Sequence, residues 1–383
     1  MRELAGAVML GGMNEQGLTG LACVFAVLSS LSFQGADEGL RWVALHDLTV
    51  EGQGWDDLES PFDRLPARAK GLVRDVVWEL SQDSAGICAR FRTNATELHC
   101  RWGLRSAELA MAHMPATGVS GVDLFVRDGD GGWRWLACPQ PVEQEMEARL
   151  IDDLDPGMRE YMLYLPLYNG VSHCEIGVPA GAELIAGEER PEGWRQPILF
   201  YGTSITQGAC ASRPGACHTA LIGRRFDRPV INLGLSGNGT METSVGGFLC
   251  ELDPAVFVID CLPNMNGEMV SERLEPLVLQ LRKARPMTPI LLVEDRTYGN
   301  AFLRSEYRAL HATNRRALRT GLDRLREQGV EGLTLVAGAD LLVNGDTVDG
   351  SHPSDLGFAR QAKILGAALE PLLYPRAKEA EGR

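Results

Sequence analysis

The chain has 383 residues, 45% of them hydrophobic, with 37 basic and 51 acidic side chains and a formal net charge of −14. This length exceeds the size at which one hydrophobic core stops growing, so it predicts two domains that each bury a core. The excess of acidic over basic side chains argues against a surface that binds the phosphate backbone of a nucleic acid, and we expect no nucleic-acid partner. The oligomeric state stays open.

The first apolar run covers residues 17–33, and polar sequence follows it from Gln34. It resembles the apolar region of a signal peptide, so we expect residues 1–36 to be a signal peptide and the protein to be exported to the periplasm or beyond. The run is short for a membrane span, and we expect no integral span. Only Arg2 is basic before it, so a buried helix or strand in a cytoplasmic protein is the alternative.

Residues 40–190 show short alternating runs broken by glycine, proline or aspartate, such as Leu98–Trp102 and Trp133–Leu136. These are strand signals, and they predict an N-terminal β-sandwich domain. The runs 161–167 and 171–176 flank Tyr168-Asn169-Gly170, where Asn-Gly predicts a tight hairpin turn. The polar stretch 187–193 is the expected domain boundary.

Three aromatic residues of this region, Trp133, Trp135 and Tyr168, have two readings. They could form a surface on which sugar rings stack. Aromatic residues at sandwich spacing more often belong to the core, and we expect core positions for them.

Residues 191–375 alternate apolar runs with helical patterns, which predicts a parallel sheet covered by helices. Residues 305–328 carry leucines at three- and four-residue steps with charges between them, which predicts an amphipathic helix. The expected strands cover residues 197–201, 230–235, 256–261, 290–294 and 333–336.

A serine follows the first of these strands, in Gly202-Thr203-Ser204, and Asp349 and His352 lie three apart near the C-terminus. A serine hydroxyl becomes a good nucleophile when an imidazole takes its proton and a carboxylate orients that imidazole. Each segment also has a structural reading, because Ser204 could cap a helix and His352 could be a solvated loop residue. Together they predict a Ser-His-Asp triad.

Two further segments follow strands and could supply hydrogen-bond donors. The glycine-rich stretch 232–239 contains Gly237, and residues 260–266 contain Asn264. An acyl-transfer transition state places negative charge on the former carbonyl oxygen, and such donors stabilise it. Taken separately, both segments could be ordinary turns.

The order Ser204, Gly237, Asn264 and His352 resembles the four motif blocks of the SGNH (GDSL-like) hydrolase superfamily. The resemblance implies that Ser204 is the nucleophile and that Asp349 and His352 complete the triad. It also implies an oxyanion hole made by the backbone N–H groups of Ser204 and Gly237 and the Asn264 side chain.

The chain departs from this pattern in two blocks. Thr203 replaces the acidic residue that usually precedes the serine. Leu262-Pro263-Asn264-Met265 replaces a Gly-x-Asn-Asp pattern, so Asn266 is an alternative oxyanion donor.

Gly121-Val122-Asp123-Leu124-Phe125 is similar to the Gly-x-Asp-Leu-Tyr signature of the subgroup in which a β-rich domain precedes the hydrolase domain. This resemblance implies a flavodoxin-like three-layer α/β hydrolase domain at 191–375 after a jelly-roll-like sandwich at 40–190. The implied activity is hydrolysis of carboxylic esters, above all acetyl groups on carbohydrates. The alternatives are a lysophospholipase or thioesterase with the same triad, or a carbohydrate-binding protein whose hydrolase domain is inactive.

We expect no cofactor and no metal in the mechanism, because no phosphate-binding glycine-lysine loop, His-Glu-x-x-His helix or strong zinc spacing occurs. Cys210 and Cys217 could form a local disulfide or be buried separately. Three polar residues follow Ser204 closely, namely Gln207, Arg213 and His218. Each of them could contact the substrate or lie on the solvated surface.

Overall fold

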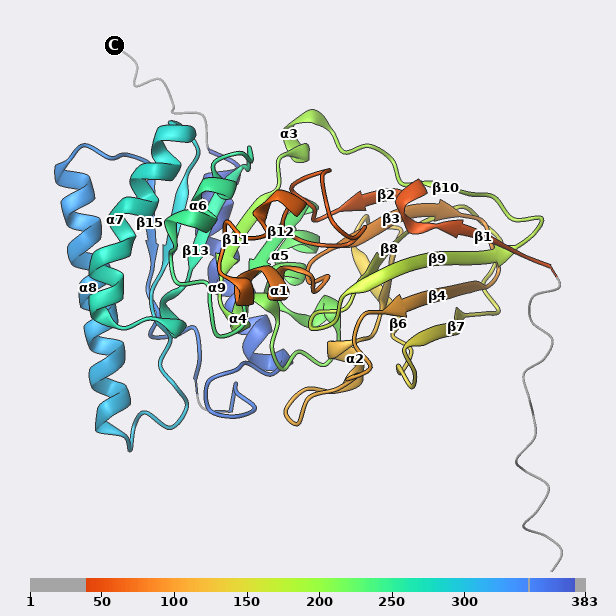
Figure 1. Cartoon of the computed structure of the whole chain (residues 1–383). Helices are drawn as coiled ribbons and strands as arrows, with labels where there is room; N and C mark the ends of the chain where they lie inside the picture. Colours follow the sequence, from red (N-terminus) through yellow and green to blue (C-terminus); the bar gives the residue numbers. More distant parts are fainter. Residues whose placement is uncertain (1–38, 344, 376–383) are drawn as a thin grey trace, which may run out of the picture. The chain divides into compact units, whose positions relative to one another are not determined.

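The computed structural model describes residues 39–343 and 345–375 (Figure 1). The expected signal peptide at 1–36 lies outside these residues. From Arg41 onward the described chain forms one compact unit. Within the described ranges, no helix combines the length and apolarity that crossing a bilayer requires.

The N-terminal half is a sandwich of two antiparallel sheets, in the strand orders β1-β9-β4-β7 and β10-β3-β8-β5-β6, with β2 paired to β3. Its core lies between the sheets, where the rings of Phe91 and Tyr161 stack at 5.5 Å and Trp102 is fully buried. The expected β-sandwich is confirmed. Its strands are β1 (Leu40–Ala44), β2 (Thr49–Glu51), β3 (Cys88–Thr93), β4 (Leu98–Leu104), β5 (Asp123–Arg127), β6 (Trp133–Ala137), β7 (Glu145–Ile151), β8 (Arg159–Tyr164), β9 (Val171–Pro179) and β10 (Leu184–Ala186).

The expected hairpin around Asn169-Gly170 is wrong. Strand β8 pairs with β3 and β5 in one sheet, whereas β9 pairs with β4 in the other, so the segment between them crosses the sandwich. Asn169 is buried there, and its amide bonds both the backbone N–H and the carbonyl of Ser106. An Asn-Gly pair gives the same sequence signal whether it closes a hairpin or anchors a segment that passes from one sheet to the other.

The expectation of core positions is wrong for Trp135, whereas Trp133 is half-buried against the apolar cluster that contains Phe125 and Tyr164. Trp133 and Trp135 lie on β6 at a sheet edge, and Trp135 is 50% exposed. The indole N–H of Trp133 donates to Asp227 of the C-terminal half, and that of Trp135 donates to Asp123 of the sandwich. The Arg213 guanidinium lies 5.2 Å from the Trp135 ring, so both rings lie where the sandwich meets the C-terminal half.

The C-terminal half is a parallel five-stranded sheet in the order β12-β11-β13-β14-β15, with helices on both faces. This is the flavodoxin-like order, and the three-layer expectation is confirmed. Residues alternate along each strand, so Leu199 and Ile259 pack toward α7 and α8 while Phe200 and Val258 pack toward α5 and α9. The strands are β11 (Ile198–Gly202), β12 (Val230–Gly234), β13 (Val256–Asp260), β14 (Ile290–Val293) and β15 (Leu333–Val336).

The helices of the described chain include the expected amphipathic helix, which runs from Ser305 to Glu327. They are α1 (Asp75–Ser81), α2 (Ala116–Val119), α3 (Glu192–Arg195), α4 (Ser204–Gln207), α5 (His218–Phe226), α6 (Thr243–Leu249), α7 (Gly267–Ala284), α8 (Ser305–Glu327) and α9 (Asp355–Leu373), with short 3-10 turns η1 (Leu45–Asp47), η2 (Ala67–Ala69), η3 (Pro214–Ala216) and η4 (Leu262–Asn264).

Candidate active site

Ser204 begins α4 directly after β11, the strand at which the chain switches from one side of the sheet to the other. Open α/β sheets bind ligands at the carboxyl ends of the strands beside this switch. The turn requires Gly202, because a Cβ atom there would lie 2.1 Å from Thr206 Oγ1 and 2.7 Å from the Asp260 carbonyl. Thr203, not Ser204, caps the helix and accepts from the Ile205 N–H. The Ser204 hydroxyl is therefore free for another partner.

That partner is His352. Ser204 Oγ lies 2.9 Å from His352 Nε2, and His352 Nδ1 lies 2.6 Å from Asp349 Oδ2. When Nδ1 carries its proton toward the carboxylate, the lone pair of Nε2 faces the hydroxyl. The fold thus joins residues 148 positions apart into one hydrogen-bonded chain.

Asp349 is held as a carboxylate by its loop. Burial raises its pKa, but the backbone N–H of His352, the imidazole and the Ser351 N–H together hold the pKa well below its usual range. Because folding lowers the pKa of Asp349, its negative charge and the stability that this charge contributes are present at any pH above the ordinary carboxyl pKa. Both are lost only as the pH falls through the lowered pKa of the folded protein. Asp349 is therefore ionised at every pH at which an esterase is ordinarily assayed.

The structure also brings the two predicted donor segments together. Asn264, at the end of η4, donates from Nδ2 to the carbonyl of Asn238 at 2.6 Å, next to Gly237. Gly237 is exposed with φ +66°, a left-handed conformation that favours glycine. One amide hydrogen of Asn264 is used in this bond and the second stays available to a ligand.

Asn266, the alternative donor, has a structural task. It is the N-cap of α7, where its Oδ1 accepts from the Met269 N–H at 2.9 Å. A capping side chain is fixed to its own helix. The geometry therefore favours Asn264 for the oxyanion site.

This difference gives a paired prediction. Asn264→Ala is expected to lower kcat for p-nitrophenyl acetate by about 10²- to 10³-fold with little change in Tm, because one oxyanion donor is lost. Asn266→Ala is the matched control, and it should keep kcat while losing about 1 kcal/mol of stability with its cap. Steady-state kinetics and thermal unfolding of both variants check this. The reverse pattern would assign the donor to Asn266.

A fully buried polar network lies under the turn that carries Ser204. Arg296 pairs with both carboxylate oxygens of Asp260, at 2.5 and 2.7 Å, and Thr206 Oγ1 lies 3.2 Å from the same carboxylate. Gln361 accepts two further bonds from Arg296. Sequence reasoning missed this network, although a carboxylate closing an otherwise apolar strand was a visible signal of a buried partner.

Residues of the N-terminal half reach Ser204. The Tyr168 hydroxyl donates to the backbone carbonyl of Ser204 at 3.2 Å. Gln207 donates to Asp83 at 2.9 Å and accepts from the Ser236 N–H at 3.0 Å, so it links the sandwich to the Gly237 loop. Tyr168 thus packs against the apolar cluster that contains Leu167 and Ile205, in partial agreement with the expected core position, and its hydroxyl supports the α4 turn.

Gln207, Arg213 and His218 do not take the positions expected for them. Gln207 and His218 are fully buried rather than solvated. His218 lies between the rings of Phe200 and Phe358, and burial lowers its pKa to about 3, so it is neutral. Arg213 pairs with a residue of the N-terminal half.

That residue is Asp123 of the Gly-x-Asp-Leu-Phe segment. Its buried carboxylate accepts from Arg213 and from the Gly215 N–H, both at 2.8 Å. Phe125 lies under the Arg224 guanidinium at 4.0 Å and against Gly215, where a Cβ atom would be 2.4 Å from the ring. The Gly-x-Asp-Leu-Phe segment therefore forms the contact between the sandwich and the loop that follows Ser204.

Cys210 and Cys217 are both free, as are the other cysteines among the described residues. Cys217 Sγ lies 3.2 Å from the Pro214 carbonyl. The two cysteines are therefore buried separately and do not form the local disulfide. Burial and the charge of Asp349 raise the pKa of Cys210 to about 12. The Cys210 thiol is thus neutral and no rival to Ser204 as a nucleophile.

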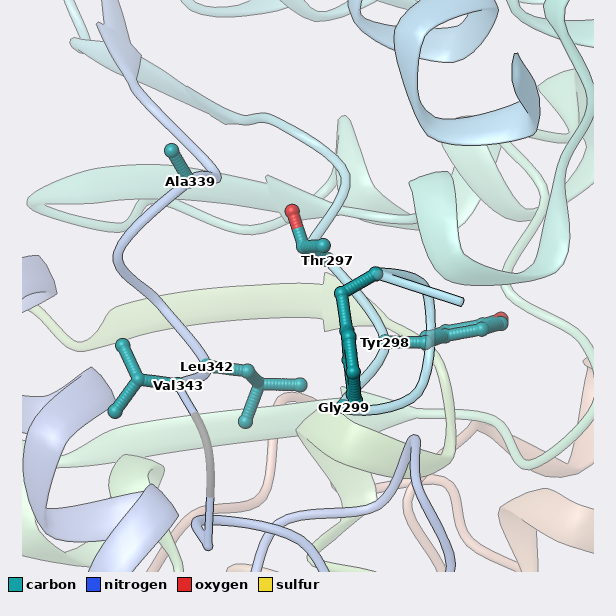
Figure 2. Close-up of a pocket in the computed structure, with 7 residues that line it drawn as sticks. Thr297, Tyr298, Gly299, Ala339, Leu342 and Val343 are labelled. Carbon is teal, nitrogen blue, oxygen red and sulfur yellow. The ribbon is translucent and has the colours of Figure 1, made fainter. Parts of the chain in front are cut away.

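A pocket of about 420 Å³ lies beside the Asp349 loop (Figure 2). The Gly299 N–H donates to the Gly350 carbonyl, and the Tyr298 hydroxyl lies 3.4 Å from the Pro263 carbonyl, next to Asn264. The pocket is lined by segments around Tyr298 and Leu342 and is mainly apolar; its residues include Thr297, Tyr298, Gly299, Phe302, Leu342 and Val343.

Comparison with known proteins assigns the family. Residues 195–370 match the GDSL-like lipase/acylhydrolase family, and residues 40–184 match the GxDLY N-terminus of SGNH-hydrolase-type esterases. A crystal structure from Bacteroides ovatus, named as a GDSL-like lipase, is 30% identical with a TM-score of 0.82 and covers 87% of this chain and 98% of its own. The chain belongs to the GDSL-like, or SGNH, hydrolase family.

Two more distant structures share the fold. The salicylyl-acyltransferase SsfX3 of a tetracycline biosynthetic pathway is 18% identical with a TM-score of 0.69, covering 88% of this chain and 99% of its own. The acetyl xylan esterase Est2A of Butyrivibrio proteoclasticus is 11% identical with a TM-score of 0.54, covering 87% and 99%. No curated protein sequence matches the chain.

Proposed function

We propose that the protein is a serine esterase that removes acetyl groups from carbohydrates. The observation that carries the proposal is the chain from Ser204 Oγ through His352 to Asp349, with hydrogen-bond distances of 2.9 and 2.6 Å. These are contact distances at which an imidazole can take the serine proton.

In the proposed mechanism, Ser204 attacks the ester carbonyl while His352 Nε2 takes the hydroxyl proton. His352 then gives that proton to the leaving alcohol, and an acyl-serine remains. Water attacks next, with His352 again as the base, and releases the carboxylic acid. The N–H groups of Ser204 and Gly237 and the Asn264 amide are proposed to hold the oxyanion.

Acetyl esters of carbohydrates are the substrate class we favour. The support is the sequence resemblance to esterases with a GxDLY domain and the shared fold of the acetyl xylan esterase Est2A. A site that fits a small acyl group rejects a long one sterically. Activity should therefore fall steeply as the acyl chain lengthens.

A lysophospholipase or thioesterase is the second candidate, and the apolar pocket beside Asp349 favours it. If that pocket takes the acyl chain, octanoate esters should be better substrates than acetate esters, and Leu342→Asp should remove this preference without affecting acetate turnover. The carbohydrate-binding alternative predicts binding without turnover.

The test combines substrate range with labelling of the nucleophile. Rates on p-nitrophenyl acetate, butyrate and octanoate would be compared, followed by acetate release from acetylated xylan and xyloglucan. A sulfonyl fluoride should abolish turnover and leave one label, on the peptide that contains Ser204. Label elsewhere, or no turnover of any ester, would count against the proposal.

A further inference from the structure

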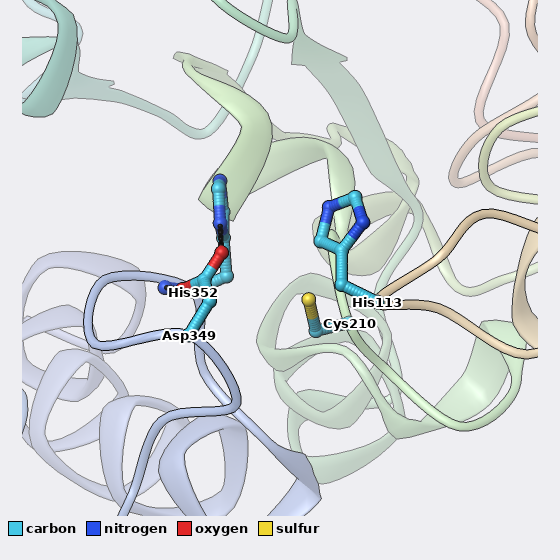
Figure 3. Close-up of side chains that lie close together, drawn as sticks. All are labelled: His113, Cys210, Asp349 and His352. Atoms are coloured by element: carbon cyan, nitrogen blue, oxygen red, sulfur yellow. Dashed lines mark hydrogen bonds and ion pairs between the residues drawn. The ribbon is translucent and has the colours of Figure 1, made fainter.

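We propose that His113, Cys210, Asp349 and His352 form a binding site for one Zn²⁺ ion at the mouth of the candidate active site, and that the bound ion stops hydrolysis. One ligand atom from each of these side chains lies within 4.8 Å of all the others. Figure 3 shows the Asp349–His352 pair on one side and Cys210 and His113 on the other.

Three separate segments supply the four side chains. His113 lies in a tight turn of the N-terminal half, closed by two backbone hydrogen bonds between Met111 and Met114 at 3.0 and 3.1 Å. Its exposed ring lies 5.8 Å from that of His352, centroid to centroid. Because the ligands are so far apart in the sequence, no zinc spacing could be recognised there.

The donor set selects the metal. One sulfur, two imidazole nitrogens and one carboxylate oxygen suit Zn²⁺, which favours four such ligands in a tetrahedron. Mg²⁺ and Ca²⁺ prefer sites of oxygen ligands alone. Because each zinc–ligand bond is about 2.0–2.3 Å long, two ligand atoms of the same ion lie no more than about 4 Å from each other. Binding therefore requires a small inward movement of the side chains, to which the exposed His113 ring can contribute by rotation.

Cys210 is held in a conformation that serves this site. It is a buried non-glycine residue with φ +71°, directly beyond the turn that ends α4. Left-handed backbone at such a residue costs about 1–3 kcal/mol and is concentrated at ligand and active sites. On binding, the thiol proton goes to solvent, the S–H bond is replaced by a Zn–S bond, and no electron is transferred.

Binding and turnover exclude each other. A lone pair of His352 that coordinates Zn²⁺ cannot take the Ser204 proton, and an Asp349 oxygen bound to the ion no longer orients the imidazole. The ion therefore acts as a reversible inhibitor rather than a cofactor. This consequence rests on the proposed esterase function, whereas the binding itself does not.

The test measures binding directly. The reduced, metal-stripped full chain would be titrated with Zn²⁺ in competition with a chromophoric chelator. Wild type should bind one equivalent, and Cys210→Ser and His113→Ala should each bind at least tenfold more weakly. Ser204→Ala should bind as wild type does. Cys138→Ser and His173→Ala are matched controls away from the site and should also be unchanged.

Inhibition would be measured in parallel. Zn²⁺ should inhibit wild-type ester hydrolysis at the concentration at which it binds, a chelator should restore the rate, and His113→Ala should need at least tenfold more Zn²⁺. His113 is exposed, so its variant tests the proposal even if Cys210→Ser fails to fold. Absence of binding to wild type, or equal affinity in His113→Ala, would overturn the site. One bound equivalent in a protein that hydrolyses no ester would leave the site standing and reject the esterase function.

Discussion

Ser204→Ala is expected to lower kcat for p-nitrophenyl acetate by about 10⁴-fold or more while leaving Tm close to that of wild type. The hydroxyl is the atom that would bond to the acyl carbon, and no other group near the carbonyl replaces it. Cys210 is close by, but its thiol is neutral because its pKa is raised to about 12. The helix α4 should survive, since Thr203 provides its cap.

The control is a second serine beside the same histidine. Ser351 Oγ lies 3.4 Å from His352 Nδ1, on the side of the ring that faces away from Ser204. Ser351→Ala removes the 3.2 Å bond from the Ser351 hydroxyl to Asp349 Oδ1 but keeps the bonds from the backbone N–H groups of Ser351 and His352, so kcat should stay within a few-fold. Wild-type rates in Ser204→Ala would refute the nucleophile assignment.

Asp349→Asn is expected to lower kcat by about 10⁴-fold, for a reason specific to this loop. Oδ1 of Asp349 accepts from two backbone N–H groups, those of Ser351 and His352, at 3.0 and 2.8 Å. An asparagine would keep its oxygen toward these donors and turn its NH₂ group toward His352 Nδ1. The imidazole would then hold its proton on Nε2, where it cannot take the Ser204 proton.

Two measurements separate this effect from unfolding. The rate of labelling by a sulfonyl fluoride should fall in parallel with kcat, because both need an activated Ser204, while circular dichroism stays unchanged. The exposed Asp130→Asn variant should label at the wild-type rate. An Asp349→Asn variant that labels normally would contradict the orienting role.

The sequence predicted most of the sheet and the positions of Ser204, Asp349 and His352, because each motif follows an apolar strand or precedes a helix start. It left Asn264 and Asn266 open, although Asn266-Gly267-Glu268 carries a capping signal that the structure shows in use. It could not predict that His113 or Tyr168 would lie near Ser204. Their positions depend on which loop of the sandwich packs against the sheet, and periodicity within a strand carries no information about that packing.

The wrong expectations share a cause. The Asn169-Gly170 pair predicts a hairpin turn and the spacing of Trp135 predicts a core position, but the first lies where the chain changes sheets and the second lies at a sheet edge beside Arg213 of the C-terminal half. The local sequence pattern shows which face of a helix or strand is buried and where that helix or strand ends. It does not describe long-range partners such as Arg213, which donates to the Asp123 carboxylate 90 positions earlier in the chain.

The contacts between the two halves bear on how the protein can be divided. Arg64, fully buried, donates to the carbonyls of Asn232 and Gly234 on β12, and Gln207 donates to Asp83. A chain cut at the boundary near residue 190 would leave β12 carbonyls and the Gln207 amide without partners beneath the Ser204 turn. The sandwich is thus part of the support of this turn, and we expect the C-terminal half alone to be less stable than the full chain.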